Sequence, residues 1–284
     1  KKMKKFILVL LLVAIFGYEL KNEPVPSKGC GKANSLQNHF RFTGGGIEHE
    51  IYLDVPSNYD NNKPYKLVFG MHCMGGSAQG VRNERYYGMK DLDTTQSAIF
   101  VAPHGYTDGM PWRVSDDKDH KFFGEFLQHL KDNLCIDESR VFSAGFSFGA
   151  MFTNSLAQDF QDQLRAVAVF ATADINIYIP KNAGKPIAWL GTVGMSDNLC
   201  SPQLGRSARD RILRNNGPGG TDCTSEKATE YSGNGPHVCY SYKTVDPNYP
   251  VRWCTFNGGH MWDPREGNQR PWTTEEAWAF FSQF

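Results

Sequence analysis

The chain has 284 residues, of which 40% are hydrophobic, so it is long enough for one large domain or two small ones. Its 30 basic residues balance its 30 acidic residues, and this balance excludes nucleic acid and anionic membrane surfaces as expected partners. Aromatic residues make up 13% of the chain, and rings that the core does not need could stack on sugar or phenolic rings.

The N-terminal residues predict a secretory signal peptide. A basic stretch at residues 1–5 precedes an apolar run at residues 6–16, which is the order found in such leaders. The run is shorter than the about 20 residues that cross a bilayer, so a membrane anchor is the less favoured alternative. We expect a signal peptide over residues 1–20 and a secreted, extracellular protein with no membrane contact after cleavage. Residues 21–284 contain no linker that would divide them, and they predict a single domain.

Seven cysteines fit an exported protein with disulfides. The chain contains no Cys-x-x-Cys or His-x-x-x-His spacing, so no metal site is predicted. An odd number leaves at least one thiol free or paired between chains, and the sequence does not define the pairing. The cysteines are Cys30, Cys73, Cys135, Cys200, Cys223, Cys239 and Cys254, of which the last three cluster in a loop-rich region.

The first half of the predicted domain alternates strands and helices. Residues 47–55 alternate apolar and polar side chains, which is typical of an antiparallel strand at or next to a sheet edge. Residues 65–71 and 98–102 are short apolar runs, typical of buried parallel strands. Residues 81–95 are polar and predict some helix. Residues 115–130 begin with acidic side chains and then place apolar residues at helical spacing.

The second half continues the same alternation. Strands are predicted at residues 165–170, 186–191 and 251–256, and the Gly-rich residues 215–236 predict a long loop. Residues 273–281 begin with a Thr-x-x-Glu capping pattern and predict a closing helix. This order predicts an α/β fold, with a mostly parallel central sheet and helices on both faces.

The most specific feature is the stretch of residues 141–150, which reads as a strand, then Gly-x-Ser-x-Gly, then a helix. A nucleophile elbow needs this order. Glycine at positions 145 and 149 leaves room for Ser147 to adopt a strained backbone with its hydroxyl exposed. The amide of Phe148 would open the helix, where partial positive charge favours an oxyanion. The alternative is chance, since the chain has 28 glycines.

A serine hydroxyl becomes a good nucleophile when a base takes its proton and a third group orients that base. In the α/β-hydrolase fold, serine, acid and histidine follow one another along the chain. Only His237 and His260 follow Ser147. His260 comes directly after the last predicted strand and two glycines, so it is the predicted base, whereas His237 is predicted to be a surface histidine.

Two aspartates are candidates for the acid. Asp197 lies just beyond the strand before the last, where a triad carboxylate belongs. Asp174 ends the preceding strand and is the competitor. Either aspartate could instead only cap its loop.

The loop after residues 65–71 is the predicted source of a second oxyanion donor. It reads His72-Cys-Met-Gly-Gly76, and the backbone amide of Cys73 or Met74 could face the oxyanion beside the amide of Phe148. Cys73 stands where the His-Gly-x-Gly pattern of esterases has a glycine, and this departure predicts a disulfide or a buried thiol. His72 is predicted to position the turn.

With these residues assembled, the chain resembles secreted feruloyl esterases of carbohydrate esterase family 1, of the fungal type, which are related to acetylxylan esterases and polyhydroxybutyrate depolymerases. The similarity runs from about Gly29 to the C-terminus. The matching stretches are residues 29–32, 52–60, 64–69, 72–76, 135–151 and 253–260.

The resemblance implies hydrolysis of the ester links between ferulic or p-coumaric acid and arabinose on the xylan of plant cell walls. It implies Ser147 as nucleophile, Asp197 as acid and His260 as base, with no metal or cofactor. The expected partner is feruloylated arabinoxylan, and we expect a monomer. An acetylxylan esterase, a polyester depolymerase and a non-catalytic polysaccharide-binding relative are the alternatives.

Three aromatic residues are candidates for substrate binding. Trp112 and Trp262 could stack on the phenolic ring or on xylan. Phe146, which like Phe148 flanks the serine, could line an acyl pocket. Packing within the core is the alternative for each of them.

Overall fold

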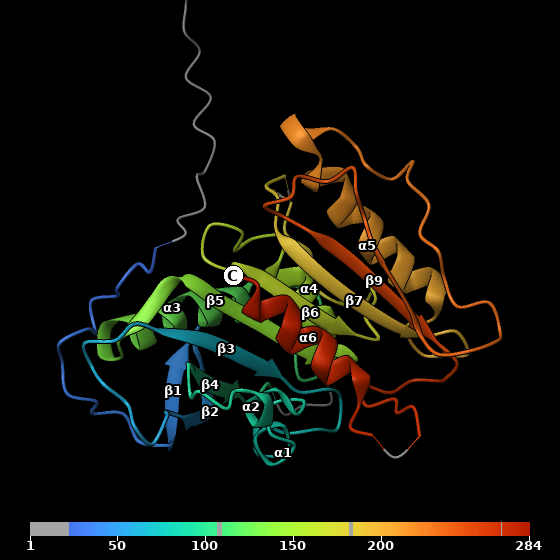
Figure 1. The fold of residues 1–284 in the computed structure, drawn as a ribbon. Helices are drawn as coiled ribbons and strands as arrows, with labels where there is room; N and C mark the ends of the chain where they lie inside the picture. Colours follow the sequence, from blue (N-terminus) through green and yellow to red (C-terminus); the bar gives the residue numbers. More distant parts are fainter. Residues whose placement is uncertain (1–22, 107–109, 182–183, 268) are drawn as a thin grey trace, which may run out of the picture.

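A computed structural model describes residues 23–106, 110–181, 184–267 and 269–284, so the predicted signal peptide lies outside the described residues. Within them, nine strands form one sheet in the order β1-β2-β4-β3-β5-β6-β7-β9-β8 (Figure 1). The strands are β1 His39–Gly44, β2 Ile47–Asp54, β3 Tyr65–Met71, β4 Ala98–Pro103, β5 Ile136–Phe146, β6 Ala166–Phe170, β7 Ala188–Gly194, β8 Val238–Ser241 and β9 Val251–Phe256.

The middle of this sheet is parallel and its two margins are antiparallel. The strands from β4 through β3, β5, β6 and β7 to β9 all pair in parallel. The pairs β1 with β2, β2 with β4, and β8 with β9 are antiparallel. The carboxyl ends of the parallel strands therefore share one edge, which is where open α/β sheets bind ligands.

Helices cover both faces of the sheet, as predicted (Figure 1). Side chains alternate between the faces along each strand: in β3, Leu67 and Phe69 belong to one core and Val68 to the other. Residues of α3, α4 and α5 pack in the first core, and residues of α1, α2 and α6 pack in the second. The helices are α1 Ala78–Asn83, α2 Met89–Leu92, α3 Lys118–Asn133, α4 Phe148–Leu156, α5 Pro202–Asn216 and α6 Trp272–Ser282.

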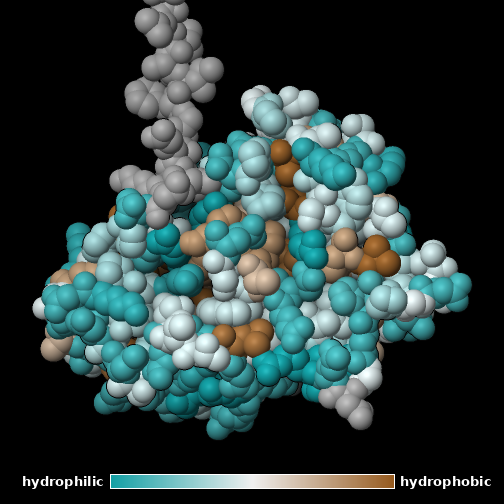
Figure 2. All heavy atoms as spheres, in the orientation of Figure 1, coloured by the Kyte–Doolittle hydropathy of each residue, from teal (hydrophilic) through white to brown (hydrophobic). Residues whose placement is uncertain are grey.

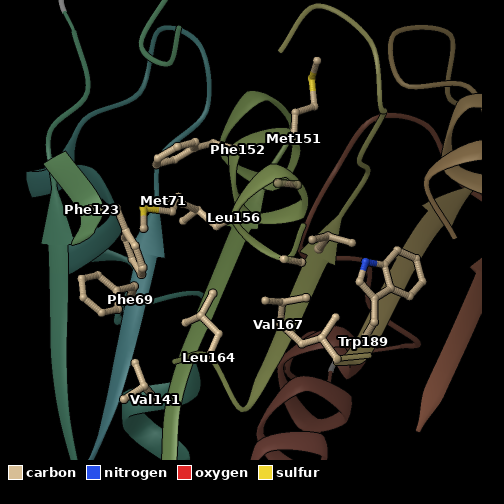
Figure 3. Packing of buried hydrophobic residues seen from close by; sticks show 14 of the residues in the cluster. Phe69, Met71, Phe123, Val141, Met151, Phe152, Leu156, Leu164, Val167 and Trp189 are labelled. Carbon is tan, nitrogen blue, oxygen red and sulfur yellow. The ribbon is translucent and has the colours of Figure 1, made fainter. Parts of the chain in front are cut away.

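The helix α4 is the most deeply embedded, since all nine of its residues are buried. Figure 3 shows Phe152 and Leu156 of α4 over side chains such as Met71 and Val167 from neighbouring strands. Burying a large apolar side chain contributes about 1.5–3 kcal/mol to stability. The amino end of α4 is therefore held firmly against the carboxyl end of β5.

The helix α5 was not predicted, because its sequence has few apolar residues. The buried hydrophobic side chains of α5 are those of Ala208, Ile212 and Leu213, and Arg209 is buried beside them. Its local start signal was present: the Ser201 hydroxyl accepts a hydrogen bond from the Leu204 amide, and proline follows the cap.

Two further elements differ from the predictions. The edge strand β1 was not predicted, although its side chains alternate between exposed and half-buried as those of an edge strand do. The expected cap at Thr273 is wrong: α6 begins one residue earlier, and its N-cap position, Pro271, makes no side-chain bond. The Thr273 hydroxyl instead donates to the carbonyl of Trp262 at 2.5 Å, and the Thr274 hydroxyl donates to that of Tyr87 at 2.8 Å. These hydroxyls tie α6 to the loops rather than to its own backbone.

Two disulfides are present among the described residues. Cys30 is bonded to Cys135, and Cys239 to Cys254, which is its direct partner across β8 and β9. Cys73, Cys200 and Cys223 are free thiols, so Cys73 is not in a disulfide. Burial raises the pKa of the Cys73 thiol and keeps it neutral at pH 7.

Both ends of the described chain lie near the start of β5. The Val25 amide donates to the Asp137 carboxylate at 2.9 Å, and the Arg140 guanidinium donates to the carbonyl of Phe284. The amino edge of the sheet therefore holds both ends, away from the carboxyl edge. Among the described residues, no helix has the length and apolar character that a membrane span requires.

Candidate active site

The Gly-x-Ser-x-Gly stretch forms a sharp turn between β5 and α4. Ser147 has φ 54° and ψ −121°, a backbone conformation that a non-glycine residue adopts only under strain. Its amide donates to the carbonyl of Phe170 at 2.9 Å, which ties the turn to the end of β6. The serine is therefore held at the carboxyl edge, directly before the first amide of a buried helix.

The two glycines of this turn are required by contacts with backbone atoms. A Cβ at Gly145 would lie 2.3 Å from the carbonyl oxygen of Gly149, because the helix folds back over the strand. A Cβ at Gly149 would lie 2.0 Å from the carbonyl oxygen of Met71 and 2.6 Å from that of His72. The loop that follows β3 therefore runs against the amino end of α4, which is the arrangement that an oxyanion hole needs.

Ser147, His260 and Asp197 form one hydrogen-bonded chain. The Ser147 Oγ lies 2.7 Å from the Nε2 of His260, and the Nδ1 of His260 lies 2.8 Å from the Oδ2 of Asp197. Since a carboxylate only accepts, Nδ1 carries the proton and Nε2 is free to accept one from the serine. The His260 side chain is 14% exposed and that of Asp197 is fully buried. This geometry suits proton transfer from the hydroxyl to the imidazole.

The loops after β7 and β9 bring the last two of these residues together. The Met195 amide donates to the carbonyl of Phe256, and the Ser196 amide donates to that of Gly258, each at 2.9 Å. A Cβ at Gly194 would lie only 2.3 Å from the Gly258 carbonyl oxygen. Glycine thus permits a close approach of two backbones, which fixes the separation of Asp197 from the histidine loop.

Asp197 is itself held in place by backbone donors. Its Oδ1 accepts hydrogen bonds from the amides of Leu199 and Cys200, each at 2.9 Å. With the Nδ1 of His260, the Asp197 carboxylate has three hydrogen-bond donors. These donors fix the orientation of the carboxylate, and the carboxylate in turn orients the imidazole.

The competing residues lie elsewhere. Asp174 accepts two hydrogen bonds from the Arg211 guanidinium, at 2.9 and 3.3 Å, so its charge is used in a structural ion pair. The Nδ1 of His237 lies 2.8 Å from the Glu266 carboxylate, and its ring stacks on Trp272 at 3.8 Å. Neither residue makes a hydrogen bond with the triad.

His72 organises the loop beside the amino end of α4, as predicted. Its Nδ1 donates to the Cys73 carbonyl and its Nε2 accepts from the Gly105 amide, both at 2.8 Å. These two bonds require the neutral imidazole, and burial agrees with them by lowering the pKa of His72 to about 4. The Cys73 carbonyl also accepts from the Gly76 amide at 3.0 Å. The loop backbone is thereby fixed at neutral pH.

The aromatic candidates divide into two groups. The structure corrects the expectation that Trp112 stacks on a substrate, because the side chain is fully buried. Its ring stacks on Phe152 at 4.4 Å, and its indole donates to the carbonyl of His72 at 2.9 Å. Phe146 is half-buried and lies 4.8 Å from the His260 ring, and Trp262 is half-buried. These two remain available to a ligand.

Tyr87 is a residue of this region that the sequence did not reveal. Its buried hydroxyl donates to the carbonyl of Met71 at 2.6 Å, and its ring contacts Trp262 edge-on at 5.3 Å. Arg85, Tyr86 and Tyr87 all have positive φ, between 54° and 58°, which is costly for bulky residues. No sequence pattern predicts a bulky residue in this conformation.

One cluster has the spacing of metal ligands but not the chemistry. Ligand atoms of His237, Cys239 and Glu276 lie within 4.8 Å of one another. The Cys239 sulfur is already bonded to Cys254, and Glu276 accepts two hydrogen bonds from Arg252. Without a thiolate and a free carboxylate, these residues do not fit a metal ion.

The parallel sheet, the strained serine before a buried helix and the hydrogen-bonded His260 and Asp197 define a carboxylic ester hydrolase of the α/β-hydrolase fold. Solved structures agree on the fold: an acetyl xylan esterase from Aspergillus awamori superposes with a TM-score of 0.57 at 15% identity, covering 87% of this chain and 99% of that one. A ferulic acid esterase superposes with a TM-score of 0.53 at 15% identity, covering 77% and 88%.

Sequence comparison gives the family. Feruloyl esterase D of Neurospora crassa is 34% identical over 272 residues, which cover 91% of each chain. Feruloyl esterase C of Emericella nidulans is 31% identical over 259 residues, which cover 90% of each. No protein-family model matches the chain. At this identity and coverage, the chain belongs to the feruloyl esterase family.

Proposed function

We propose that this enzyme is a secreted feruloyl esterase that releases ferulic or p-coumaric acid from feruloylated arabinoxylan of plant cell walls. The hydrogen-bonded chain from Ser147 through His260 to Asp197 carries the proposal. The names of the relatives supply the substrate class. The catalytic unit is the single domain of residues 21–284, acting as a monomer, and its two disulfides suit an extracellular protein.

In the first step, the Ser147 hydroxyl attacks the feruloyl carbonyl carbon while His260 Nε2 takes its proton. The buried Asp197 carboxylate stabilises the imidazolium that forms. His260 then gives the proton to the departing sugar oxygen, and the acyl group stays on the serine. In the second step the same imidazole takes a proton from water, which attacks the acyl-enzyme and releases the acid.

The oxyanion of each tetrahedral intermediate would lie between the amide of Phe148 and an amide of Cys73 or Met74. The first amides of a helix have no partner within it, and they carry partial positive charge. The contact of Gly149 with the carbonyls of Met71 and His72 supports this placement, since it brings the two sources of amides together. Loss of one such donor costs about 3–4 kcal/mol in the transition state.

Phe146 and Trp262 are the proposed contacts for the aromatic acyl group. Phe146 lies against the imidazole, close to where the acyl carbon must be attacked. Trp262 lies two residues after His260, and its ring contacts that of Tyr87 edge-on at 5.3 Å. Flat rings in these positions suit a planar phenolic acid.

The test compares the hydrolysis of methyl ferulate with that of p-nitrophenyl acetate. We expect turnover of both substrates, with the higher kcat/KM for methyl ferulate. Turnover of the acetyl ester alone would indicate an acetyl esterase on this scaffold. Labelling by a serine-directed organophosphonate, lost in Ser147→Ala, identifies the nucleophile, and a chain that does not react would be a binding protein.

A further inference from the structure

Three buried tryptophans differ in the acceptors that their indole N–H groups hold. Trp112, Trp189 and Trp253 are fully buried, whereas the face seen in Figure 2 is mainly hydrophilic and its hydrophobic areas are small and separate. A buried indole N–H usually has a hydrogen-bond partner. Those of Trp189 and Trp253 donate to side chains, at 3.0 and 2.8 Å. Trp112 is the one of the three that donates to the backbone, at the carbonyl of His72.

The His72 carbonyl belongs to the peptide unit that carries the N–H of Cys73. No peptide bond among the described residues is cis, and in a planar trans unit the carbonyl and the N–H point in opposite directions. Fixing the carbonyl therefore fixes the direction of the Cys73 amide, which is one of the two candidate oxyanion donors of this loop. The same carbonyl oxygen lies against α4, since a Cβ at Gly149 would come within 2.6 Å of it.

The ring of Trp112 also contacts the helix that supplies the other oxyanion donor. It stacks on Phe152 with the ring centroids 4.4 Å apart. Phe152 lies one turn along α4 from Phe148, whose amide is the proposed first donor. The backbone next to the tryptophan is anchored too, because the Arg113 amide donates to the buried Asp119 carboxylate at 2.5 Å. One rigid side chain therefore contacts both sources of oxyanion amides.

The carbonyls on either side of this peptide unit are held differently. The Met71 carbonyl accepts from the Tyr87 hydroxyl at 2.6 Å, in the unit that carries the His72 amide, which is not a candidate donor. The Cys73 carbonyl accepts from the imidazole of His72 at 2.8 Å, so a neighbour within the loop fixes the amide that follows. Trp112 thus supplies, from outside the loop, the contact that fixes a candidate donor.

We propose that Trp112 is a positioning residue of the oxyanion hole, whose indole N–H sets the Cys73 amide against the first amide of α4. The side chain acts through the peptide unit that it holds and makes no contact with the substrate. The inference rests on the proposed function, because acylation and deacylation each form an oxyanion at this place. It takes the Cys73 amide, rather than that of Met74, as the second donor.

Trp112→Phe removes the N–H and keeps a flat ring against Phe152. We expect kcat for methyl ferulate to fall about tenfold, which is part of the about 10²–10³-fold loss that follows removal of a whole oxyanion donor, with KM within about twofold of wild type. Phenylboronic acid forms a tetrahedral adduct with a catalytic serine, and one of its oxygens takes the place of the oxyanion. Its affinity should fall by about the same factor as kcat. An unchanged kcat, or an unchanged affinity for the boronic acid, overturns the inference.

Two variants show whether the effect belongs to this peptide unit. Trp189→Phe removes an equally buried indole N–H that donates to a side chain, and kcat should stay within about twofold of wild type. Tyr87→Phe frees the adjacent carbonyl and should lower kcat less than Trp112→Phe does. A loss in either variant as large as that in Trp112→Phe overturns the assignment.

Folding and substrate are controlled separately. Urea unfolding establishes that each variant is folded in the assay. If Trp112→Phe does not fold, replacing Trp112 by benzothienylalanine exchanges the N–H for sulfur in a ring of nearly the same shape, with the same expected losses. Turnover of methyl ferulate by the wild-type enzyme tests the proposed function itself. If the wild-type enzyme hydrolyses only p-nitrophenyl acetate, the proposed substrate is wrong, and the same variants compared on the acetyl ester decide the inference.

Discussion

The part of the chain that the structure describes contains two hydrogen-bonded chains of serine, histidine and aspartate. In the first, at the carboxyl edge, His260 joins Ser147 and Asp197 at 2.7 and 2.8 Å. In the second, between α3 and α4, the Nε2 of His120 lies 2.8 Å from the hydroxyl of Ser155, and its Nδ1 lies 2.9 Å from the Asp159 carboxylate. The distances are nearly equal, so distance does not separate the two.

The environments of the two serines distinguish the two hydrogen-bonded chains. Ser155 lies in the last turn of α4, is fully buried, and its hydroxyl donates to the carbonyl of Tyr178. The Ser155 hydroxyl proton is therefore engaged by that carbonyl, and the hydroxyl oxygen accepts a hydrogen bond from His120. Ser147 has a strained backbone before the first amides of α4, and the oxygen of a substrate can reach those amides. A hydrolase site needs this exposure and these donors as much as it needs the three side chains.

The sharpest test of the comparison is the loss of each hydroxyl. Ser147→Ala should lower kcat/KM for methyl ferulate by at least about 10⁴-fold, because no nucleophile remains. Ser155→Ala, the same change in the other chain, should keep kcat/KM within about threefold of wild type and act on stability, by about 1–3 kcal/mol, because its buried partners lose a hydrogen bond. Initial rates and urea unfolding measure the two effects. Residual activity of Ser147→Ala near the wild-type level would reject the elbow assignment.

The two aspartates, Asp197 and Asp159, should differ in their importance for catalysis as the two serines do. Asp197→Asn should lower kcat by about 10⁴-fold, because an amide cannot stabilise the imidazolium and favours the wrong tautomer of His260. Asp159→Asn is the matched control and should leave kcat close to the wild-type value. Steady-state kinetics with unchanged circular dichroism measure both. Equal losses in the two variants would mean that the second chain also serves catalysis.

A backbone substitution tests whether the elbow needs its glycines. Gly149→Ala would place a Cβ 2.0 Å from the Met71 carbonyl oxygen, so the helix or the loop after β3 must move. We expect destabilisation of about 1–3 kcal/mol and a fall in kcat larger than that of Ser155→Ala, because the two sources of oxyanion donors separate. Gly124→Ala on α3, whose Cβ would meet only the ring of Phe160 at 3.3 Å, is the control. Wild-type activity in Gly149→Ala would contradict the proposed oxyanion site.

The smallest effect concerns pH. The hydrogen bond from His120 lowers the pKa of Asp159 below its usual value of 3.8. A carboxyl whose folded pKa is depressed adds stability above its unfolded pKa, and this contribution is lost as the pH falls through the folded pKa. The gain is small because the Asp159 side chain is 43% exposed. Asp159→Asn should therefore reduce the difference in Tm between pH 5 and pH 3, by an amount measurable in thermal melts, and an unchanged difference would show that the pair contributes nothing.

The sequence predicted the parts of this molecule whose patterns are local. Residues 65–71 read as a buried strand, and the elbow at 141–150 reads as strand, turn and helix, since each needs only its own side chains. Together with the predicted strands at residues 98–102, 165–170, 186–191 and 251–256, these elements account for the six strands that pair in parallel. The two glycines before His260 favoured this residue over His237 as the predicted base.

The remainder depended on contacts between distant residues. Trp112 looks the same in a sequence whether it faces a ligand or Phe152. The helix α5 is polar because it packs through few apolar residues beside a buried Arg209. The positive φ of Tyr87 is stabilised by its bond to Met71, sixteen positions away. Such features follow from tertiary packing, and no local pattern encodes them.

The location of the two ends of the described chain has a practical consequence. Val25 and Phe284 are both anchored at the start of β5, whereas Ser147 follows the end of the same strand. A tether attached at either end would leave from the back of the enzyme and keep the triad facing outward. Immobilisation on a bead, or fusion to a module that adheres to plant fibre, should therefore present the active face to an insoluble substrate without blocking it.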